Sequence, residues 1–190
     1  MPKKIILLAG PTASGKSKLA IQLAKKLNGE IINADSMQIY KEFSILSSRP
    51  NKLEIKKIKH HLYGTISAKK HFSSGDWFKE AKKKINICFK NKKIPIIVGG
   101  TGLYFNTITK GISNIPDIDI KTRSKVRSLF NRLGYQKFYE ELLKLDPKVK
   151  HKILPTDSQR TQRAYEVKLK TKKSLFEWIA KTKSEFLDYN

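Results

Sequence analysis

The segment that decides the fold is a glycine-rich loop near the start of the chain, Gly10-Pro11-Thr12-Ala13-Ser14-Gly15-Lys16-Ser17. It matches the pattern G-x-x-x-x-G-K-[ST] at every fixed position. An apolar run at residues 5–9 precedes it and predicts a strand, and apolar residues at helical spacing over 19–27 follow it. Because strand, loop and helix occur in this order, the segment predicts a phosphate-binding loop rather than an ordinary turn.

Each fixed residue of this loop has an expected task. Gly10 and Gly15 let the backbone curl so that its N–H groups point inward at an anion, and the following helix adds its positive end. Lys16 is expected to reach the terminal phosphate oxygens, and the hydroxyl of Ser17 is expected to hold Mg²⁺. The loop therefore predicts a site for a di- or triphosphate.

The remaining apolar pattern predicts an α/β fold. Runs at 30–34 and 94–98 predict two further strands, and residues 60–64 allow a short fourth one. We predict a P-loop NTPase-like parallel sheet flanked by helices in residues 1–116, with an all-helical, basic domain inserted or appended in residues 117–190. Sheets of this type usually have about five or six strands, so the core is expected to be incomplete.

Helix signals follow the second strand and dominate the later part of the chain. The lysine-rich residues 51–59 predict a solvated helix, and Ser73 to Asp76 read as the start of another. Further on, one apolar stripe closes at Gly134 and a second follows it. Asp157 predicts a helix N-cap, and residues 174–177 form a capping box.

Two turns at predicted strand ends carry candidate chemistry. Asp35 ends the second strand on the same edge as the phosphate-binding loop, where α/β sheets bind ligands. It could hold Mg²⁺, act as a general base on a hydroxyl or amine, or cap the segment that follows. Residues 99–102 form a second glycine-rich turn, in which Thr101 has the only side-chain hydroxyl.

The histidines and the single cysteine give a weaker signal. His60 and His61 are adjacent, so their side chains should point apart, and no third ligand follows at a metal-binding spacing. We therefore predict structural histidines. Cys88 falls on the buried stripe of the helix that starts near Ser73, which predicts a core residue rather than a nucleophile.

Composition excludes several classes of protein. One cysteine rules out a disulfide scaffold, and the absence of a run of about eighteen apolar residues or a signal peptide predicts a cytoplasmic protein without a membrane contact.

The net charge of +24 points to a polyanionic partner, although 34 of the 40 basic residues are lysines and give the whole surface a positive charge. The arginines carry more information, because five of the six lie between residues 123 and 163. Arg160 and Arg163 share one helix face, whereas Arg127 and Arg132 fit helix ion pairs.

Taken together, these motifs resemble the tRNA dimethylallyltransferase (tRNA isopentenyltransferase) family over essentially the whole chain. The residues that carry the resemblance are the loop at 10–17, Asp35-Ser36 with Ile39-Tyr40, His61-Leu62, residues 98–104, and Asp157 with Gln159-Arg160 and Arg163-Ala164. The resemblance implies transfer of a dimethylallyl group from dimethylallyl diphosphate to the exocyclic amine of the adenosine 3′ to the anticodon in tRNA.

The resemblance also implies roles for individual residues. Lys16, Ser17 and Mg²⁺ would stabilise the departing pyrophosphate, Asp35 would take a proton from the attacking amine, and Thr101 would help orient it. The target base would be flipped out of its stack. The protein would bind the tRNA anticodon stem-loop as a monomer. The implied tRNA-binding residues are Asp35, Ser36, Met37, Gln38, Thr101, Arg123, Gln159, Arg160, Thr161, Gln162 and Arg163.

The chain departs from the family in two places. Leu46-Ser47-Ser48-Arg49-Pro50 stands where the family usually has Gly-Thr-Ala-Lys-Pro, and the family continues beyond residue 190 with a further diphosphate-binding arginine. We therefore expect a truncated form. Three alternatives stay open from the sequence: a small-molecule kinase of the P-loop class, an adenylate prenyltransferase, and a noncatalytic RNA-binding remnant.

Overall fold

The computed structural model describes residues 4–43, 49–50, 56 and 58–186, which belong to two compact units. The first unit comprises Met1–Gly111 with Ser184–Asn190, and the second comprises Ile112–Lys183. The boundary that the sequence suggests after residue 116 differs from this division at both ends. Residues 184–186 join the first unit because the Ser184 hydroxyl donates to the carbonyl of Ile108 and the Phe186 ring packs edge-on against Phe78 with centroids 6.0 Å apart.

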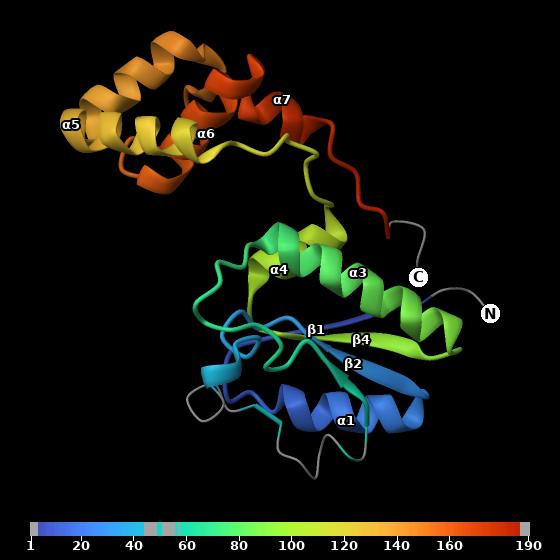
Figure 1. Ribbon diagram of the computed structural model, residues 1–190. Helices are drawn as coiled ribbons and strands as arrows, with labels where there is room; N and C mark the ends of the chain where they lie inside the picture. The colour runs from blue at the N-terminus through green and yellow to red at the C-terminus, as the bar shows by residue number, and fades with distance from the viewer. Residues whose placement is uncertain (1–3, 44–48, 51–55, 57, 187–190) are drawn as a thin grey trace. The chain divides into compact units, whose positions relative to one another are not determined.

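The first unit is built on a parallel sheet. In the described part of the chain the sheet has four strands in the order β1-β4-β2-β3, and every neighbouring pair is parallel (Figure 1). The strands are β1 (Ile6–Ala9), β2 (Gly29–Asn33), β3 (His60–His61) and β4 (Ile94–Gly99). The predicted parallel α/β sheet and its short extra strand are therefore confirmed.

Helices cover the two faces of this sheet. Helix α1 lies against one face, and helices α3 and α4 lie against the other, with a 3-10 turn η1 between β2 and β3 (Figure 1). Ala20 and Ala24 of α1 pack on a buried cluster that includes Ile31 and Ile96. Because side chains alternate along a strand, their neighbours Ile32 and Ile97 face the α3 side. The elements are α1 (Lys16–Lys26), η1 (Lys41–Phe43), α3 (Ser74–Lys90) and α4 (Gly102–Thr109).

Helix α3 forms as its sequence predicts. Ser73 is the N-cap and Asp76 completes a capping box, and the hydrogen bonds from Ser73 hold the pKa of the Asp76 carboxyl below its usual value. The buried residues of α3 recur at helical spacing and are Trp77, Phe78, Ala81, Ile85 and Cys88. The helix predicted at 51–59 lies for the most part outside the described residues.

The second unit is helical. Its elements are α5 (Ile120–Leu145), the 3-10 turn η2 (Pro147–Val149), α6 (Ser158–Thr171) and α7 (Leu175–Ala180). Helix α5 is interrupted at Gly134, whose φ of 71° and ψ of −179° are not helical, so the predicted break between two apolar stripes is confirmed. Asp157 caps α6 and Ser174 forms a capping box with Glu177, as predicted. The core of the unit comprises Tyr139, Leu142, Val149, Ile153 and Ala164.

None of the described helices combines the length and the apolar character that crossing a bilayer requires.

Candidate functional site

Three turns are joined at the carboxyl end of the sheet. The N–H of Gly10, after β1, donates to the carbonyl of Gly99, the last residue of β4, over 3.3 Å. The N–H of Ala34, after β2, donates to Val98 over 2.7 Å, and the N–H of Thr101 donates back to Ala34 over 3.1 Å. The phosphate-binding loop, the turn of Asp35 and the turn of Thr101 therefore lie on one edge of the sheet, as their positions in the sequence predict.

Glycines at the end of β4 permit this close approach. A Cβ placed on Gly99 would lie 2.1 Å from the carbonyl oxygen of Ala34 and 2.7 Å from the backbone nitrogen of Asp35. A Cβ on Gly100 would lie 3.3 Å from the carbonyl oxygen of Gly10. Any side chain at position 99 would push the turn after β4 away from Asp35, so the second glycine-rich turn is a packing requirement of the site.

The loop between β1 and α1 has the curled backbone that an anion site needs. Ala13 and Gly15 adopt left-handed conformations, with φ values of 63° and 80°. Gly15 is the N-cap of α1 and offers no side chain to the N–H groups of the first helical turn. Those N–H groups and the positive end of the helix are therefore directed at the space enclosed by the loop.

Lys16 folds back across the loop. Its ammonium group donates to the carbonyl of Pro11 and lies 3.4 Å from the hydroxyl oxygen of Ser14. Ser17 follows on the exposed side of α1. An ammonium group held over curled N–H groups concentrates positive charge at one point, which is the arrangement that a diphosphate requires.

Asp35 is half-buried and its carboxylate has a fixed orientation. Its Oδ1 accepts the N–H of Met37 over 2.9 Å, so the carboxylate also caps the turn that follows β2. Its Oδ2 has no hydrogen-bond partner among the described residues. The two roles proposed from the sequence, capping and proton acceptance, are therefore compatible within one side chain, because each uses a different oxygen.

The side chain of Asn33 holds the turn of Asp35 through hydrogen bonds, and the sequence analysis did not identify this residue. The residue is fully buried. Its Oδ1 accepts the N–H of Asp35 over 2.9 Å, and its Nδ2 donates to the carbonyls of Asp35 and Leu62, each over 3.0 Å. The signal in the sequence was a polar amide at the end of an apolar strand, two residues before a candidate base.

The neighbouring residues of the turn are differently exposed. The Met37 side chain is 52% exposed, whereas Gln38 is half-buried and its carbonyl accepts the N–H of Gly64. Tyr104, at the start of α4, stacks on Trp77 with ring centroids 4.4 Å apart. Burial, and then the nearby charges of Tyr40 and Asp35, raise the pKa of Tyr104 to about 12, so its hydroxyl stays protonated at neutral pH.

The turn between η1 and β3 carries the departure from the family pattern. Leu46, Ser47 and Ser48 lie outside the described residues. Arg49 donates to the carbonyl of Lys41 over 2.8 Å, and its guanidinium lies on the backbone of Gly64, where a Cβ would be 1.7 Å from Nη1. Arg49 therefore braces the segment after β3 through backbone contacts.

The predicted RNA-binding residues of the second unit divide into surface and core. On α6, Arg160 is exposed and pairs with Asp157 at 3.2 Å, and Arg163 pairs with Glu166 at 3.5 Å. Gln159 is exposed and Gln162 is half-buried. On α5, Arg123 is half-buried, and its Nε has no hydrogen-bond partner in the described part of the chain.

Thr161 does not fit the role that was expected of it. The residue is fully buried, and its hydroxyl donates to the carbonyls of Asp157 and Ser158 over 3.0 and 3.1 Å. Its side chain secures the first turn of α6 and does not reach the surface of the unit.

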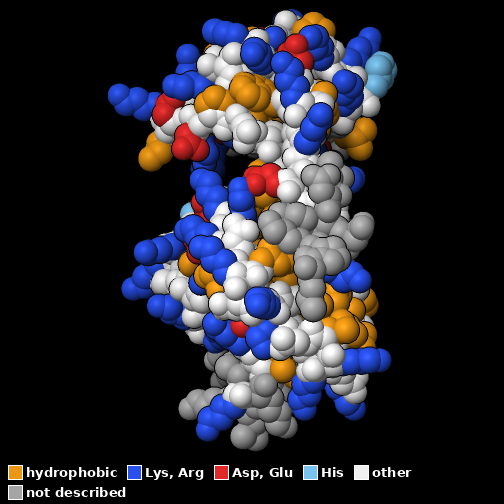
Figure 2. Space-filling model, turned by 90° about the vertical axis from the view of Figure 1, so that its right-hand side faces the viewer, with side chains coloured by type: hydrophobic (Ala, Val, Ile, Leu, Met, Phe, Trp, Pro, Cys, Tyr) orange, Lys and Arg blue, Asp and Glu red, His pale blue; other side chains and the backbone are white. Residues whose placement is uncertain are grey.

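Positive charge is spread widely over the face of the molecule that Figure 2 shows. The space-filling view shows Lys and Arg side chains distributed over the visible face instead of collected in one patch (Figure 2). On this face, positive charge alone therefore does not locate a polyanion-binding surface.

This fold and this site define a P-loop NTPase-like α/β protein with an additional helical unit. The sequence profile of the family described as IPP transferase matches residues 38–190. The chain therefore belongs to the IPP transferase family.

Curated relatives agree with this assignment. The chain is 57% identical over 185 residues to the tRNA dimethylallyltransferase of Pelagibacter ubique, covering 97% of this chain and 59% of that protein. It is 47% identical over 188 residues to the tRNA dimethylallyltransferase of Rickettsia bellii, covering 98% of this chain and 60% of the relative. The chain thus spans about 60% of the length of these relatives.

Solved structures give the same result. A eukaryotic dimethylallyltransferase acting on tRNA aligns with a TM-score of 0.83 and 34% identity, over 95% of this chain and 45% of that one. The full-length tRNA isopentenylpyrophosphate transferase of Bacillus halodurans aligns with a TM-score of 0.59 and 35% identity, over 91% of this chain and 57% of that one.

Proposed function

We propose that this protein transfers a dimethylallyl group from dimethylallyl diphosphate to the exocyclic amine of the adenosine 3′ to the anticodon in tRNA. The observation that carries the proposal is the edge of the sheet where the phosphate-binding loop, Asp35 and Thr101 are joined by backbone hydrogen bonds. An anion site, a proton acceptor and a hydroxyl on one edge are the groups that this transfer needs.

The loop binds the donor in this proposal. The N–H groups of the loop and of the first turn of α1 surround the diphosphate, and Lys16 leaves the carbonyl of Pro11 to pair with its oxygens. The Ser17 hydroxyl is a hard oxygen donor of the kind that Mg²⁺ prefers, so this residue would hold the ion beside the diphosphate. Bound there, Mg²⁺ would supply positive charge that stabilises the leaving pyrophosphate.

Asp35 and Thr101 act on the acceptor. The amine nitrogen attacks C1 of the dimethylallyl group while the bond from C1 to the diphosphate oxygen breaks, and the Oδ2 of Asp35 takes the proton that the amine loses. The Thr101 hydroxyl, which lies beside the Asp35 turn, orients the amine. The adenine is flipped out of the anticodon stack to reach these groups.

The second unit supplies RNA contacts in this proposal. Arg123, Gln159, Arg160, Gln162 and Arg163 offer guanidinium and amide groups to phosphates and bases. Thr161 does not contact RNA in this proposal, because its side chain is buried and stabilises the first turn of α6. We further propose that the protein works as a cytoplasmic monomer on the tRNA anticodon stem-loop.

Mass spectrometry of tRNA hydrolysates tests the function. Unmodified tRNA is incubated with dimethylallyl diphosphate, Mg²⁺ and the protein, and digested to nucleosides. We expect a dimethylallyl-adenosine product that depends on both substrates. A parallel reaction with adenosine monophosphate as acceptor tests for an adenylate prenyltransferase. A second one, with ATP and small hydroxyl acceptors, tests for a small-molecule kinase. Product from adenosine monophosphate alone, or phosphorylation by ATP, would replace the proposal with one of those activities.

A further inference from the structure

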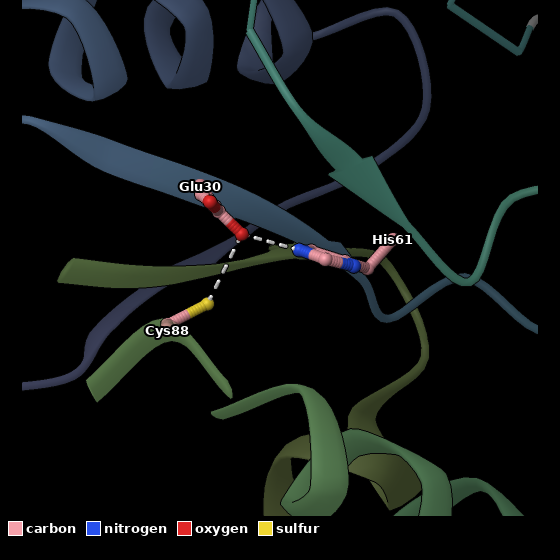
Figure 3. Close-up of side chains that lie close together, drawn as sticks. All are labelled: Glu30, His61 and Cys88. Atoms are coloured by element: carbon pink, nitrogen blue, oxygen red, sulfur yellow. Dashed lines mark hydrogen bonds and ion pairs between the residues drawn. The ribbon is translucent and has the colours of Figure 1, made fainter. Parts of the chain in front are cut away.

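Three side chains with metal-binding atoms meet inside the first unit, away from the phosphate-binding loop. Glu30 comes from β2, His61 from β3 and Cys88 from α3, and all three point into the layer between the sheet and α3 (Figure 3). Nε2 of His61 lies 2.6 Å from Oε2 of Glu30, and Sγ of Cys88 lies 3.6 Å from the same oxygen. The three ligand atoms all lie within 4.8 Å of one another.

These polar groups occupy a position where the fold otherwise places apolar residues. Glu30 is 6% exposed, His61 is 8% exposed and Cys88 is fully buried. Burying a carboxylate is costly unless a partner compensates its charge. The buried carboxylate of Glu30 therefore needs a compensating partner, which the same group at the solvent-exposed surface would not need.

The sequence shows no third ligand at a metal-binding spacing from the paired histidines, and the fold brings the residues of this cluster together from distant positions. His60 and His61 point to opposite sides of the sheet, and Nδ1 of His60 bonds to the carbonyl of Ile58 at 2.7 Å. The partners of His61 are 31 and 27 residues away and come from two other elements. Spacing along the sequence could not reveal them.

We propose that Glu30, His61 and Cys88 bind one Zn²⁺-type transition-metal ion. Thiolate, imidazole and carboxylate together are a zinc-type ligand set, and they differ from the all-oxygen ligands that Mg²⁺ prefers. Ligand atoms about 2.0–2.3 Å from a tetrahedral ion lie roughly 3.5 Å apart. The Glu30–Cys88 separation of 3.6 Å meets this spacing, and the Glu30–His61 pair has to open by roughly 1 Å.

Charge balance supports an ion at this position. A divalent cation with one carboxylate, one thiolate and one neutral imidazole gives a site of zero net charge, which suits a dry interior. Forming the metal–sulfur bond at Cys88 breaks the S–H bond and releases the thiol proton to solvent.

The proposed ion would tie the short strand β3 to its neighbours. β3 has only two residues and pairs with β2 along one edge. A metal bound by Glu30, His61 and Cys88 would cross-link β2, β3 and α3, so it would stabilise the first unit without taking part in transfer chemistry. The proposal therefore stands independently of the proposed function.

Cobalt binding tests the site directly, because Cys88 is the only cysteine of the chain. Untagged, chelator-treated protein is titrated with Co²⁺, and the thiolate-to-cobalt charge-transfer absorption reports ligation by this one residue. We expect one Co²⁺ per chain, release of at least one proton per ion, and displacement by Zn²⁺. Zn²⁺ should also raise the Tm of the wild-type chain.

Variants of the three proposed ligands and of a neighbouring residue test whether Co²⁺ binds at this site. Cys88→Ser should abolish the absorption, and Glu30→Gln and His61→Gln should weaken Co²⁺ binding by at least about 10-fold. His60→Gln, at the adjacent position on the opposite face, should bind Co²⁺ like the wild type. If wild-type protein binds Co²⁺ without the thiolate absorption, or does not bind it, the proposal is overturned; this holds even where a variant fails to fold.

Discussion

Thr101 and Ser36 are 65 residues apart in the chain and are joined by a hydrogen bond, in which Oγ1 of Thr101 accepts the backbone N–H of Ser36 over 2.9 Å. The same hydroxyl lies 3.3 Å from the hydroxyl oxygen of Ser36. Thr101 is the N-cap of α4, yet its side chain does not cap that helix. The hydroxyl is directed at the turn after β2, so the position of Asp35 depends on the turn after β4.

Thr101→Ala tests this dependence. The substitution leaves the half-buried N–H of Ser36 without its acceptor, and we expect a loss of about 1 kcal/mol in the free energy of unfolding. We expect turnover to fall by about 10–100-fold, because a small displacement of a catalytic group is costly. Urea unfolding and the tRNA prenylation assay measure the two effects. Thr101→Ser keeps the hydroxyl and should restore both, and a serine variant as defective as alanine would contradict the role of the hydroxyl.

Asp35→Asn separates proton acceptance from capping. The amide oxygen of asparagine can still accept the N–H of Met37, but the side chain cannot take a proton from an amine. We expect turnover to fall by about 10²–10⁴-fold with little change in stability or in tRNA affinity. Asp35→Ala should lower turnover similarly and also lose stability. Turnover of Asp35→Asn within a few-fold of wild type would show that Asp35 is not the base.

Asn33→Ala removes the support beneath Asp35. The half-buried N–H of Asp35 and the carbonyl of Leu62 lose their partners, so we expect a loss of about 2–3 kcal/mol in the free energy of unfolding. Chemical denaturation monitored by circular dichroism measures the loss. The matched control is Asn131→Ala, at an exposed position of α5, which should stay within about 0.5 kcal/mol of wild type. Similar small effects of both substitutions would mean that Asn33 does not hold the turn.

The strands of the first unit, and the residues that meet at the carboxyl end of its sheet, can be predicted from the sequence. Residues 5–17 specify strand, loop and helix by local pattern, and Asp35 and Thr101 follow strands that must be parallel neighbours. These predictions succeed because the carboxyl ends of parallel strands share one edge, whatever the details of packing.

The contacts that sequence reasoning missed are those between side chains distant in the chain. The cluster of Glu30, His61 and Cys88 brings together residues up to 58 positions apart, and it depends on which face of each strand a side chain occupies. Thr161 lies between polar residues that read as one exposed face, but helical rotation turns its side chain into the core. A local pattern does not determine such orientations without the packing of neighbouring elements.

Glu177 makes the stability of the second unit depend on pH. Its hydrogen bond with Lys148 first, and then the N–H of Ser174, lower its pKa from 4.5 to about 2. A carboxyl whose pKa is lowered by folding stabilises the folded state at pH values above its pKa in the unfolded chain. That contribution is lost as the pH falls from about 4.5 towards 2. We expect Glu177→Gln to be less stable than wild type at neutral pH and the difference to vanish near pH 2. Urea unfolding across this pH range measures it, and a difference that does not change with pH would contradict the assignment.

The last prediction separates RNA recognition by α6 from general basicity. Arg160 pairs with Asp157, the N-cap of α6, and Arg163 pairs with Glu166 of the same helix, and these ion pairs position the two guanidinium groups along one face. Lysine keeps the charge but loses the planar pair of donors, so Arg160→Lys with Arg163→Lys should weaken tRNA binding by about 1–3 kcal/mol. The dependence of the Kd on salt should stay nearly unchanged, because the number of positive charges is the same. The matched control is Arg127→Lys with Arg132→Lys, at exposed positions of α5 in the same unit. Filter binding of tRNA at several salt concentrations measures both pairs, and equal losses would mean that α6 is ordinary basic surface.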